Sequence, residues 1–345
     1  MTYLTGMIAL DITAGAPNNG RGEDNIGVVK QIRAGRNIHP YVSAQAFRRW
    51  LRDSLPSSEP RSPVTRSGSG KNQQAYTGGR PDLYLDDDLF GYMVAVKGEN
   101  STFMRDTVLA TGTLVSVAPR TPARDFGTMS RGFAADQHPV IHEHELYTAE
   151  LAGGILLDLP RIGTFEPAAG GMRRNLTPAV VQEALKDGAE ETVFRGAPCI
   201  RLPAAERRRR AAVLLRALAE VRGGAKNALH YGERTPALVV LAPMKGGNNP
   251  FTRLLTVVDR QVVFDSDVLR EEITAWGSEL DGPVRAGWSP GFLGGQRETV
   301  AKELDDLLDD GRLVIEHPRV MLRDLAGEID AGQHDNWFAD EPAAS

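Results

Sequence analysis

Residues 41–55, YVSAQAFRRWLRDSL, decide how this chain folds. Ser43 stands where the N-cap of a helix is expected, directly before a run with helical period. The apolar residues share one face at helical spacing, flanked by Ala46 and Trp50. They are Ala44, Phe47, Leu51 and Leu55. The opposite face carries one amide and three guanidinium groups, from Gln45, Arg48, Arg49 and Arg52. The stretch therefore predicts a short helix that buries an aromatic face and presents a line of cations.

This line of arginines has two interpretations. Like charges at i, i+4 destabilise an isolated helix by roughly 0.2–0.5 kcal/mol per pair. Their alignment therefore favours an anionic partner, and a phosphate backbone suits the planar, permanently charged guanidinium group. The alternative is a solvated basic face that pairs with carboxylates elsewhere in the chain, which is the commoner use of surface arginine. Taken alone, the helix favours this second interpretation.

Composition places the chain among soluble globular proteins. Its 345 residues, 41% hydrophobic and 25% charged, suffice for one large domain or two modest ones. The single Cys199 excludes an intramolecular disulfide and a cysteine-cluster zinc or iron–sulfur site. No stretch reaches the roughly 18 uninterrupted apolar residues of a membrane span, and the N-terminus lacks the pattern of a signal peptide. We expect a cytoplasmic protein with no membrane partner.

Charge is distributed unevenly along the chain, whose net charge is −5. Residues 1–53 carry seven Arg or Lys against four Asp or Glu, and residues 201–234 carry nine against three. Residues 298–345 carry four against thirteen. Such segregation lets a protein bind a polyanion at one place and repel it at another. It also favours head-to-tail stacking of copies, acidic end on basic patch, which builds open helical filaments.

Hydrophobic periodicity predicts a mixture of strands and helices. The main expected strands are 3–12, 105–118, 144–159, 237–243 and 255–264, and the clearest helix is 204–222. Residues 56–81 lose most apolar side chains and predict a surface insertion. The acidic, polar chain from about residue 330 onward predicts disorder.

Two charged runs invite a functional interpretation. Asp86–Asp88 suggest a metal site, but adjacent carboxylates point in different directions, so we expect them to cap the helix begun by Leu89, Phe90 and Met93. Arg207–Arg210 lie in the first turns of the predicted helix at 204–222, where cations oppose the helix dipole. This run is locally unfavourable unless an anion meets it.

Histidines at 138, 142 and 144 resemble metal ligands at first sight. An HxH pair on a strand places both rings on one face, but neither an HExxH motif nor a partner cluster accompanies it. We therefore expect structural histidines and no metal site, and no cofactor is implied.

Three loops carry signals for anion or nucleic-acid binding. The loop at 13–25 contains Asn19 and Arg21 among residues that could expose backbone N–H groups. The loop at 223–227, GGAKN, carries Lys226 and Asn227 and could admit a phosphate backbone closely, although it is not a Walker A motif.

The third signal lies between residues 119 and 142. Apolar side chains alternate there with arginine, a pattern suited to wedging between bases and clamping a backbone. The residues concerned are Arg124, Phe126, Met129 and Arg131. The alternative is an ordinary long loop whose apolar residues pack underneath it.

Several stretches taken together resemble one protein family. They are EDNIGVVKQIRAG (23–35), YVSAQAFRRWLRDSL (41–55), DDDLFGYM (86–93), APRTPARDFGTMSR (118–131), HEHELYTAELAGG (142–154) and GGAKNALHYG (223–232). They resemble the backbone subunit of the type I-B CRISPR Cascade complex (the Cas seven family), in the DevR-type branch of the RAMP superfamily. The resemblance covers most of residues 1–165 and returns at 220–245.

The resemblance implies an α+β fold: an RRM-like (ferredoxin-like) palm with a large inserted finger region and a thumb hairpin. The implied divisions are 1–55, first part of the palm; 56–104, finger insertion; 105–118, palm strand; 119–142, thumb hairpin; 143–330, remainder of the palm with helical insertions; and 331–345, an acidic disordered tail. The aromatic signature of RRM domains is missing, so bases are not expected to stack on the sheet face.

The resemblance also implies a function. Copies of a non-catalytic backbone subunit would stack along the guide crRNA and present it for pairing with target DNA in antiviral defence, together with other Cascade subunits. The residues that would contact RNA are Asn19, Arg21, Gln45, Arg48, Arg49, Arg52, Arg124, Phe126, Met129, Arg131, Lys226 and Asn227.

Two other functions stay open at this point. A metal-dependent RNase, as in the backbone subunits of type III complexes, could use Asp24 in the loop after the first strand, because Mg²⁺ is held through one or two carboxylates and waters. A DNA-binding autoregulator is suggested only by the name of the branch. The sequence contains no helix-turn-helix pattern to support that function.

Overall fold

The computed structural model describes residues 1–20, 22, 26–70, 73–95, 102–129, 131, 132, 138, 140–166 and 174–340. The helices are α1 (Ala44–Ser54), α2 (Leu85–Phe90), α3 (Pro178–Lys186), α4 (Ala204–Leu218), α5 (Ser266–Ala275), α6 (Gln296–Glu303), α7 (Asp305–Asp309) and α8 (Pro318–Asp330). Short 3-10 helices are η2 (Leu159–Arg161), η3 (Pro250–Arg253) and η4 (Asp335–Phe338). In this described part, no helix is both long and apolar enough to span a membrane.

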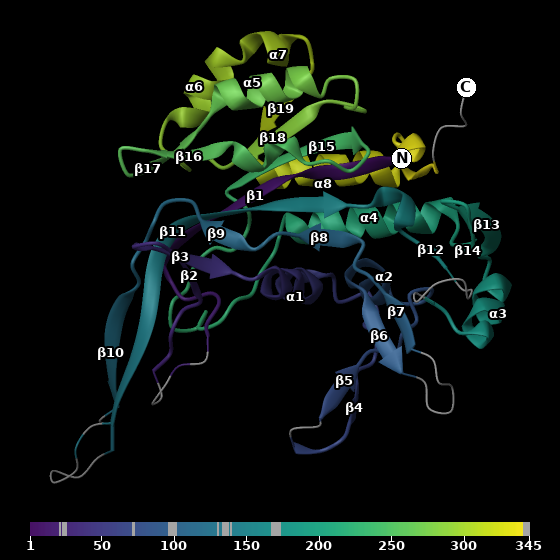
Figure 1. Cartoon of the computed structure of the whole chain (residues 1–345), viewed down its shortest axis with the longest axis horizontal. Helices are drawn as coiled ribbons and strands as arrows, with labels where there is room; N and C mark the ends of the chain where they lie inside the picture. Colours follow the sequence, from purple (N-terminus) through teal and green to yellow (C-terminus); the bar gives the residue numbers. More distant parts are fainter. Residues whose placement is uncertain are drawn as a thin grey trace.

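Strands form one large central sheet and several smaller ones (Figure 1). The strands of the central sheet are β1 (Thr2–Gly15), β2 (Gln31–Ala34), β3 (Asn37–Val42), β8 (Leu109–Thr111), β9 (Leu114–Ser116), β10 (Ala123–Met129), β11 (Val140–Leu157), β15 (Leu238–Lys245), β18 (Val284–Trp288) and β19 (Leu313–Glu316). The remaining strands are β4 (Thr65–Ser67), β5 (Gln74–Tyr76), β6 (Tyr92–Ala95), β7 (Thr102–Arg105), β12 (Thr164–Phe165), β13 (Glu190–Phe194), β14 (Ala197–Arg201), β16 (Leu255–Val258) and β17 (Gln261–Phe264).

The central sheet has the order β19-β18-β15-β1-β11-β9-β3-β2, with β8 and β10 also paired to β11. Its pairs are antiparallel except β18 with β19, so the sheet is mixed. This arrangement confirms the predicted α+β class. The predicted strand at 105–118 is instead broken into β8 and β9. Gly112 and Thr113 interrupt it opposite Gly153 and Gly154 of β11, where the ladder skips two residues.

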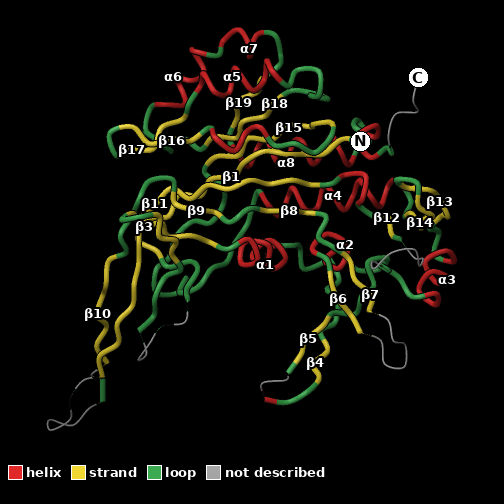
Figure 2. The backbone as a smooth tube through the Cα atoms, viewed as in Figure 1, coloured by secondary structure: helices red, strands yellow, loops and turns green. Residues whose placement is uncertain are grey.

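Successive side chains of β1 point to opposite faces of the sheet and so contribute to two hydrophobic clusters, one on each face. Ile8, Leu10 and Ile12 belong to a cluster built with α1, α4 and α8. Met7 and Ala9 point to the opposite face and join a cluster with η3, α5, α6 and α7. Helices therefore cover both sides of the β1–β15 region, as Figure 2 shows.

The helix predicted from residues 43–55 is confirmed as α1. The hydroxyl of Ser43 accepts a hydrogen bond from the backbone N–H of Ala46 at 3.3 Å, and Phe47, Trp50 and Leu51 are buried. The rings of Phe47 and Trp50 meet edge to face with centroids 6.1 Å apart. The apolar stripe thus packs against the core, while the cationic face points away from it.

The acidic run Asp86–Asp88 lies in the first turn of α2, where carboxylates favour the helix dipole, but it provides no N-cap, because Tyr84 occupies that position without a side-chain capping hydrogen bond. All three residues lie inside α2 and are buried, because each carboxylate satisfies a distant partner. Asp86 accepts a hydrogen bond from the backbone N–H of Ser62 at 3.1 Å. Asp87 accepts from the hydroxyl of Ser62 at 2.7 Å and from the backbone N–H of Arg80 at 3.0 Å.

Asp88 is the centre of a buried ion-pair network. One of its oxygens accepts a hydrogen bond from Arg105 at 2.5 Å. The other accepts from Arg210 at 2.8 Å and from the backbone N–H of Gly163 at 2.9 Å. The side chains of Asp88, Arg105 and Arg210 are at most 2% exposed. The network joins α2, β7, α4 and the turn after η2.

The arginine run of α4 meets anions of the chain itself. Arg210 also pairs with Glu206 at 2.7 Å, and Arg209 pairs with Glu206 and Glu59. Arg208 pairs with Asp335 at 2.8 Å. The cations at this helix N-terminus are thus compensated internally, which removes the need for an external anion there.

The predicted disorder of the tail is wrong for residues 331–340. This segment contains η4, in which Trp337 and Phe338 are buried. The Trp337 ring stacks on the His334 ring with centroids 3.8 Å apart. The carbonyl of Phe338 accepts a hydrogen bond from buried Arg207 at 3.0 Å. Burial of two aromatic rings outweighs the polar composition of the segment. Residues 341–345 lie outside the described residues.

Replacing Asp88 by Asn should destabilise the fold strongly. The substitution keeps the shape of the side chain but removes the counter-charge of buried Arg105 and leaves Arg210 paired with Glu206 alone, which costs about 3–5 kcal/mol of unfolding free energy. Asp53→Asn is the matched control, because it breaks an exposed pair with Arg49 worth about 0–1 kcal/mol. Urea denaturation measures both. Equal unfolding free energies for the two variants would contradict the central role of Asp88.

Candidate nucleic-acid interface

The polar face of α1 is less uniform than its sequence suggests. Gln45 is exposed, and the Arg49 side chain is 68% exposed beside Asp53 at 2.7 Å. Arg48 is half-buried and donates to the hydroxyl of Thr111 at 3.1 Å. Of the predicted residues on this helix, Gln45 and Arg49 are therefore the most accessible to a ligand.

Arg52 is held against α2. Its guanidinium lies 4.9 Å from the centroid of the Phe90 ring and its Nε lies 3.8 Å from a carboxylate oxygen of Asp86. Burial lowers the pKa of Arg52 and also that of Arg48, to which the charge of Arg52 contributes. These two side chains thus serve packing as well as charge, in partial agreement with the internal-pairing interpretation.

The loop after β1 lies at the start of α1. Asn18 accepts a hydrogen bond from the backbone N–H of Ser43 at 2.9 Å, and Asn19 forms a bridge with Val29. The side-chain oxygen of Asn19 is buried and has no hydrogen-bond partner among the residues that the structure describes. Arg21, also predicted to bind RNA, lies outside the described residues.

The glycine loop at 223–227 packs against both preceding segments. The backbone N–H of Ala225 donates to the carbonyl of Pro17 at 2.8 Å. Gly223 has a φ of +136°, and a Cβ there would lie 2.9 Å from the Trp50 ring, so only glycine fits. Lys226 is exposed and its Nζ lies beside Gly27. The fold thus brings together Asn19, α1, Lys226 and half-buried Asn227.

The segment predicted as a thumb forms the β10–β11 hairpin, which projects from the body of the molecule (Figure 1). Its register runs from Ala123 opposite Leu146 to Met129 opposite Val140. Phe126 is 62% exposed and Met129 is 56% exposed. The alternative of a loop with its apolar side chains packed underneath is therefore wrong.

Arginines flank the apolar residues of the hairpin. Arg124 lies between Glu143 and Glu145 at 3.7 and 3.8 Å, and Arg131 is exposed in the turn. Ile141 is 65% exposed on the partner strand, in register with Thr128, and extends the apolar surface beside Phe126. Sequence reasoning missed Ile141, although alternation in VIHEHEL places it on a strand face.

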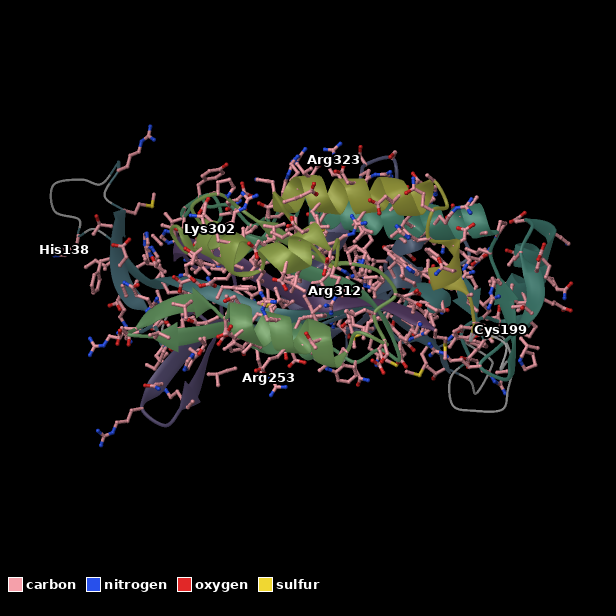
Figure 3. The ribbon with its side chains drawn as sticks, turned by 90° about the horizontal axis from the view of Figure 1, so that it is seen from above. His138, Cys199, Arg253, Lys302, Arg312 and Arg323 are labelled. Carbon is pink, nitrogen blue, oxygen red and sulfur yellow. The ribbon has the colours of Figure 1, made fainter. Side chains whose placement is uncertain are left out.

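The histidines of HxH differ in environment. His142 is exposed and His144 is buried, with Nε2 3.3 Å from a carboxylate oxygen of Asp125. His138 lies toward the thumb end of the long axis, and Cys199 lies near the other end (Figure 3). No three His, Cys, Asp or Glu side chains of the described residues come together in a way that could hold a metal ion.

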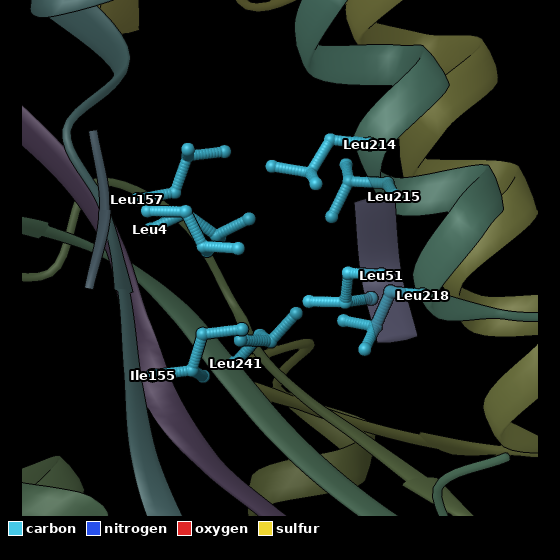
Figure 4. A pocket seen from close by; sticks show the side chains of 9 residues that line it. Leu4, Leu51, Ile155, Leu157, Leu214, Leu215, Leu218 and Leu241 are labelled. Carbon is cyan, nitrogen blue, oxygen red and sulfur yellow. The ribbon is translucent and has the colours of Figure 1, made fainter. Parts of the chain in front are cut away.

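A small gap in the core lies between α1, α4 and the sheet (Figure 4). It is lined entirely by leucine and isoleucine, among them Leu51, Leu214 and Ile155. With a volume of about 10 Å³ it approaches the minimum for one water and is too small for a substrate. This gap belongs to packing and not to a small-molecule site.

Unpartnered buried polar atoms gather near the candidate interface. Within the described residues these include Asn19 Oδ1, Asn227 Oδ1, Tyr147 Oη, His144 Nε2, His230 Nε2, and Nε and Nη2 of Arg234. Buried polar groups nearly always have a hydrogen-bond partner, and exceptions often mark binding sites. They concentrate around the loop after β1, the base of the β10–β11 hairpin and residues 223–234.

Comparison with known proteins gives a match in structure but not in sequence. No family model matches the sequence, and a search of curated proteins finds no match. One similar solved structure is described as a CRISPR RNA-guided surveillance complex. It has a TM-score of 0.54 and 12% identity, and the alignment covers 95% of this chain and 99% of that chain.

A second solved structure is described as a CRISPR RNA-guided surveillance complex in a pre-nicking state. It has a TM-score of 0.53 and 11% identity, with the same coverage of 95% and 99%. At these identities the comparisons establish the fold. This chain shares its fold, over nearly its whole length, with chains from these two complexes.

Proposed function

We propose that this chain is a non-catalytic backbone subunit of a type I-B CRISPR Cascade complex. Copies of it would stack along a guide crRNA in the cytoplasm, with other Cascade subunits, and present the guide for pairing with target DNA. The observation that carries the proposal is the projecting hairpin with exposed Phe126 and Met129 beside the meeting point of α1, the loop after β1 and Lys226. The shared fold supports it.

The palm of the proposed subunit consists of β1, α1, β8 with β9, β11, α4 and β15, in chain order. Across the sheet these strands follow the order β15-β1-β11-β9, in antiparallel pairs. This is the arrangement of a βαββαβ unit, the basis of the RRM-like fold. Residues 56–104 form the proposed finger region and residues 119–142 the thumb.

Each surface has a distinct proposed task. Phosphates of the guide meet Gln45, Arg49 and Lys226, where charge-assisted hydrogen bonds give affinity without sequence preference. Phe126 and Met129 wedge between nucleotides and separate their bases. The acidic C-terminal third favours stacking against a basic surface of the next copy.

The RNase function has no support among the described residues. Asp24, its predicted catalytic residue, lies outside them. The same holds for autoregulation, because the recognition helix of a helix-turn-helix has no counterpart in the sequence.

Removing the accessible cations should change the salt dependence of RNA binding. Arg49→Ala combined with Lys226→Ala should flatten the plot of log affinity against log salt by roughly 0.7 for each lost phosphate contact. Fluorescence anisotropy with single-stranded RNA at several salt concentrations measures this. Arg253→Ala is the control, because its side chain is 80% exposed but lies on η3 beside Glu272. A slope equal to that of the control would refute the assignment of this face.

Changes in the thumb should act differently. Phe126→Ser with Met129→Ser removes apolar area from an exposed hairpin, so we expect an unchanged salt slope and unchanged folding. Nuclease probing of bound RNA should show sites at regular intervals with the natural protein and lose that spacing with the variant. Val193→Ser, at an exposed position of β13, is the matched control. Identical cleavage patterns for all three proteins would exclude the wedge.

A further inference from the structure

Residues 225–232 connect the glycine loop to the base of the thumb. The His230 ring packs on the His144 ring with centroids 4.9 Å apart and planes inclined by 47°. His144 is 4% exposed, pairs with Asp125 in the hairpin register and forms a bridge with Gly27. The loop is therefore attached at His230 to both the thumb and the loop after β1.

Tyr231, the residue after His230 in this loop, is exposed to solvent. Tyr231 is 88% exposed, the highest value among the large exposed apolar and aromatic side chains of the described residues, and nearby Leu229 is 58% exposed. The backbone N–H groups of Leu229 and His230 both donate to the carbonyl of Lys226, at 3.0 and 2.8 Å. On the other side, Arg234 is buried. The Tyr231 ring thus projects from a loop that is fixed at both ends.

Two polar atoms of the residues shortly before Tyr231 lack hydrogen-bond partners among the described residues. Among the described residues, His230 Nε2 and Asn227 Oδ1 are buried without a hydrogen-bond partner, whereas His144 Nε2 faces a carboxylate oxygen of Asp125 at 3.3 Å. Burial, and then the neighbouring His144, lower the pKa of His230, so its imidazole is neutral near pH 7 and offers one donor and one acceptor. An aromatic ring in solvent beside unpaired polar atoms suits a planar ligand with a polar edge.

We propose that Tyr231 is a stacking platform for one nucleobase of single-stranded RNA, with His230 hydrogen-bonding the same nucleotide and Lys226 holding an adjacent phosphate. This inference rests on the proposed function and adds a base site to it. Every base has a π-face, so such a platform tolerates any guide sequence. In RRM domains, aromatic residues of the sheet stack on bases, and this chain lacks that signature. Tyr231 would provide such a contact from a loop instead.

A nucleobase is favoured over a protein partner by the cation on the same loop. Exposed Lys226 lies five residues before Tyr231 and its Nζ is beside Gly27, within the surface formed by the loop after β1. A cation for the backbone and an aromatic ring for a base are combined in single-strand binding sites, and this loop carries one of each.

The test compares oligouridine with an abasic ribose-phosphate strand of equal length, using the full chain and fluorescence anisotropy. Tyr231→Ala should weaken binding to oligouridine roughly 10- to 100-fold, the range of aromatic stacking on a base. It should leave binding to the abasic strand and the salt slope unchanged. Tyr231→Trp should restore the affinity for oligouridine, whereas Tyr231→Leu, which lacks a π-face, should not.

Two further comparisons separate the possible failures. His230→Leu should weaken oligouridine binding roughly 2- to 10-fold, and His230→Gln, which keeps a donor and an acceptor, should retain it. If the natural protein binds neither strand, the proposed function fails and this inference fails with it. If it binds both strands with a salt slope that depends on Arg49 and Lys226, but Tyr231→Ala binds oligouridine as tightly as the natural protein, only the base site is wrong.

Discussion

The burial of the Asp88 carboxylate between Arg105 and Arg210 is the constraint on which the rest of the structure depends. Two guanidinium groups and one carboxylate are buried together. Backbone carbonyls of Thr164 and Arg161 accept further hydrogen bonds from Arg105, and the carbonyl of Pro81 accepts one from Arg210. Because removal of Asp88 would leave Arg105 as an unpaired buried charge and Arg210 with Glu206 alone, this carboxylate fixes α2, α4 and β7 relative to one another. The proposed finger region is attached to the palm at this point.

Internal pairing also determines which cations are left for a ligand. The run Arg207–Arg210 has the highest charge density in the sequence, yet its members are occupied by Asp335, Glu59, Glu206, Asp88 and backbone carbonyls. Arg49 and Lys226 belong to less basic stretches but remain exposed. Accessibility, and not local charge density, therefore decides where a polyanion can bind.

The sequence predicts features that depend on neighbours within a few residues. Ser43 and the spacing of Phe47 and Leu51 predict α1, and alternation in the chain predicts β1, β11 and β15. The role of Asp88 could not be predicted, because Arg105 and Arg210 are 17 and 122 residues away. The order of residues 331–340 likewise depends on the burial of Trp337 and Phe338 against distant elements. Tyr231 gives no signal in sequence, since exposure is a property of the whole fold.

Strand β11 belongs to two parts of the molecule at once. Its C-terminal half lies in the centre of the sheet, paired with β1, and its N-terminal half forms one side of the projecting hairpin, the proposed thumb, paired with β10. The hairpin is consequently anchored in the hydrophobic core at its base, because β11 runs without interruption from the sheet into the hairpin. A force on the tip of the hairpin would therefore act on the hydrogen bonds between β1 and β11 and not on a flexible hinge. At about 3.4 Å per residue, the fixed length of this 18-residue strand sets how far the hairpin extends from the core.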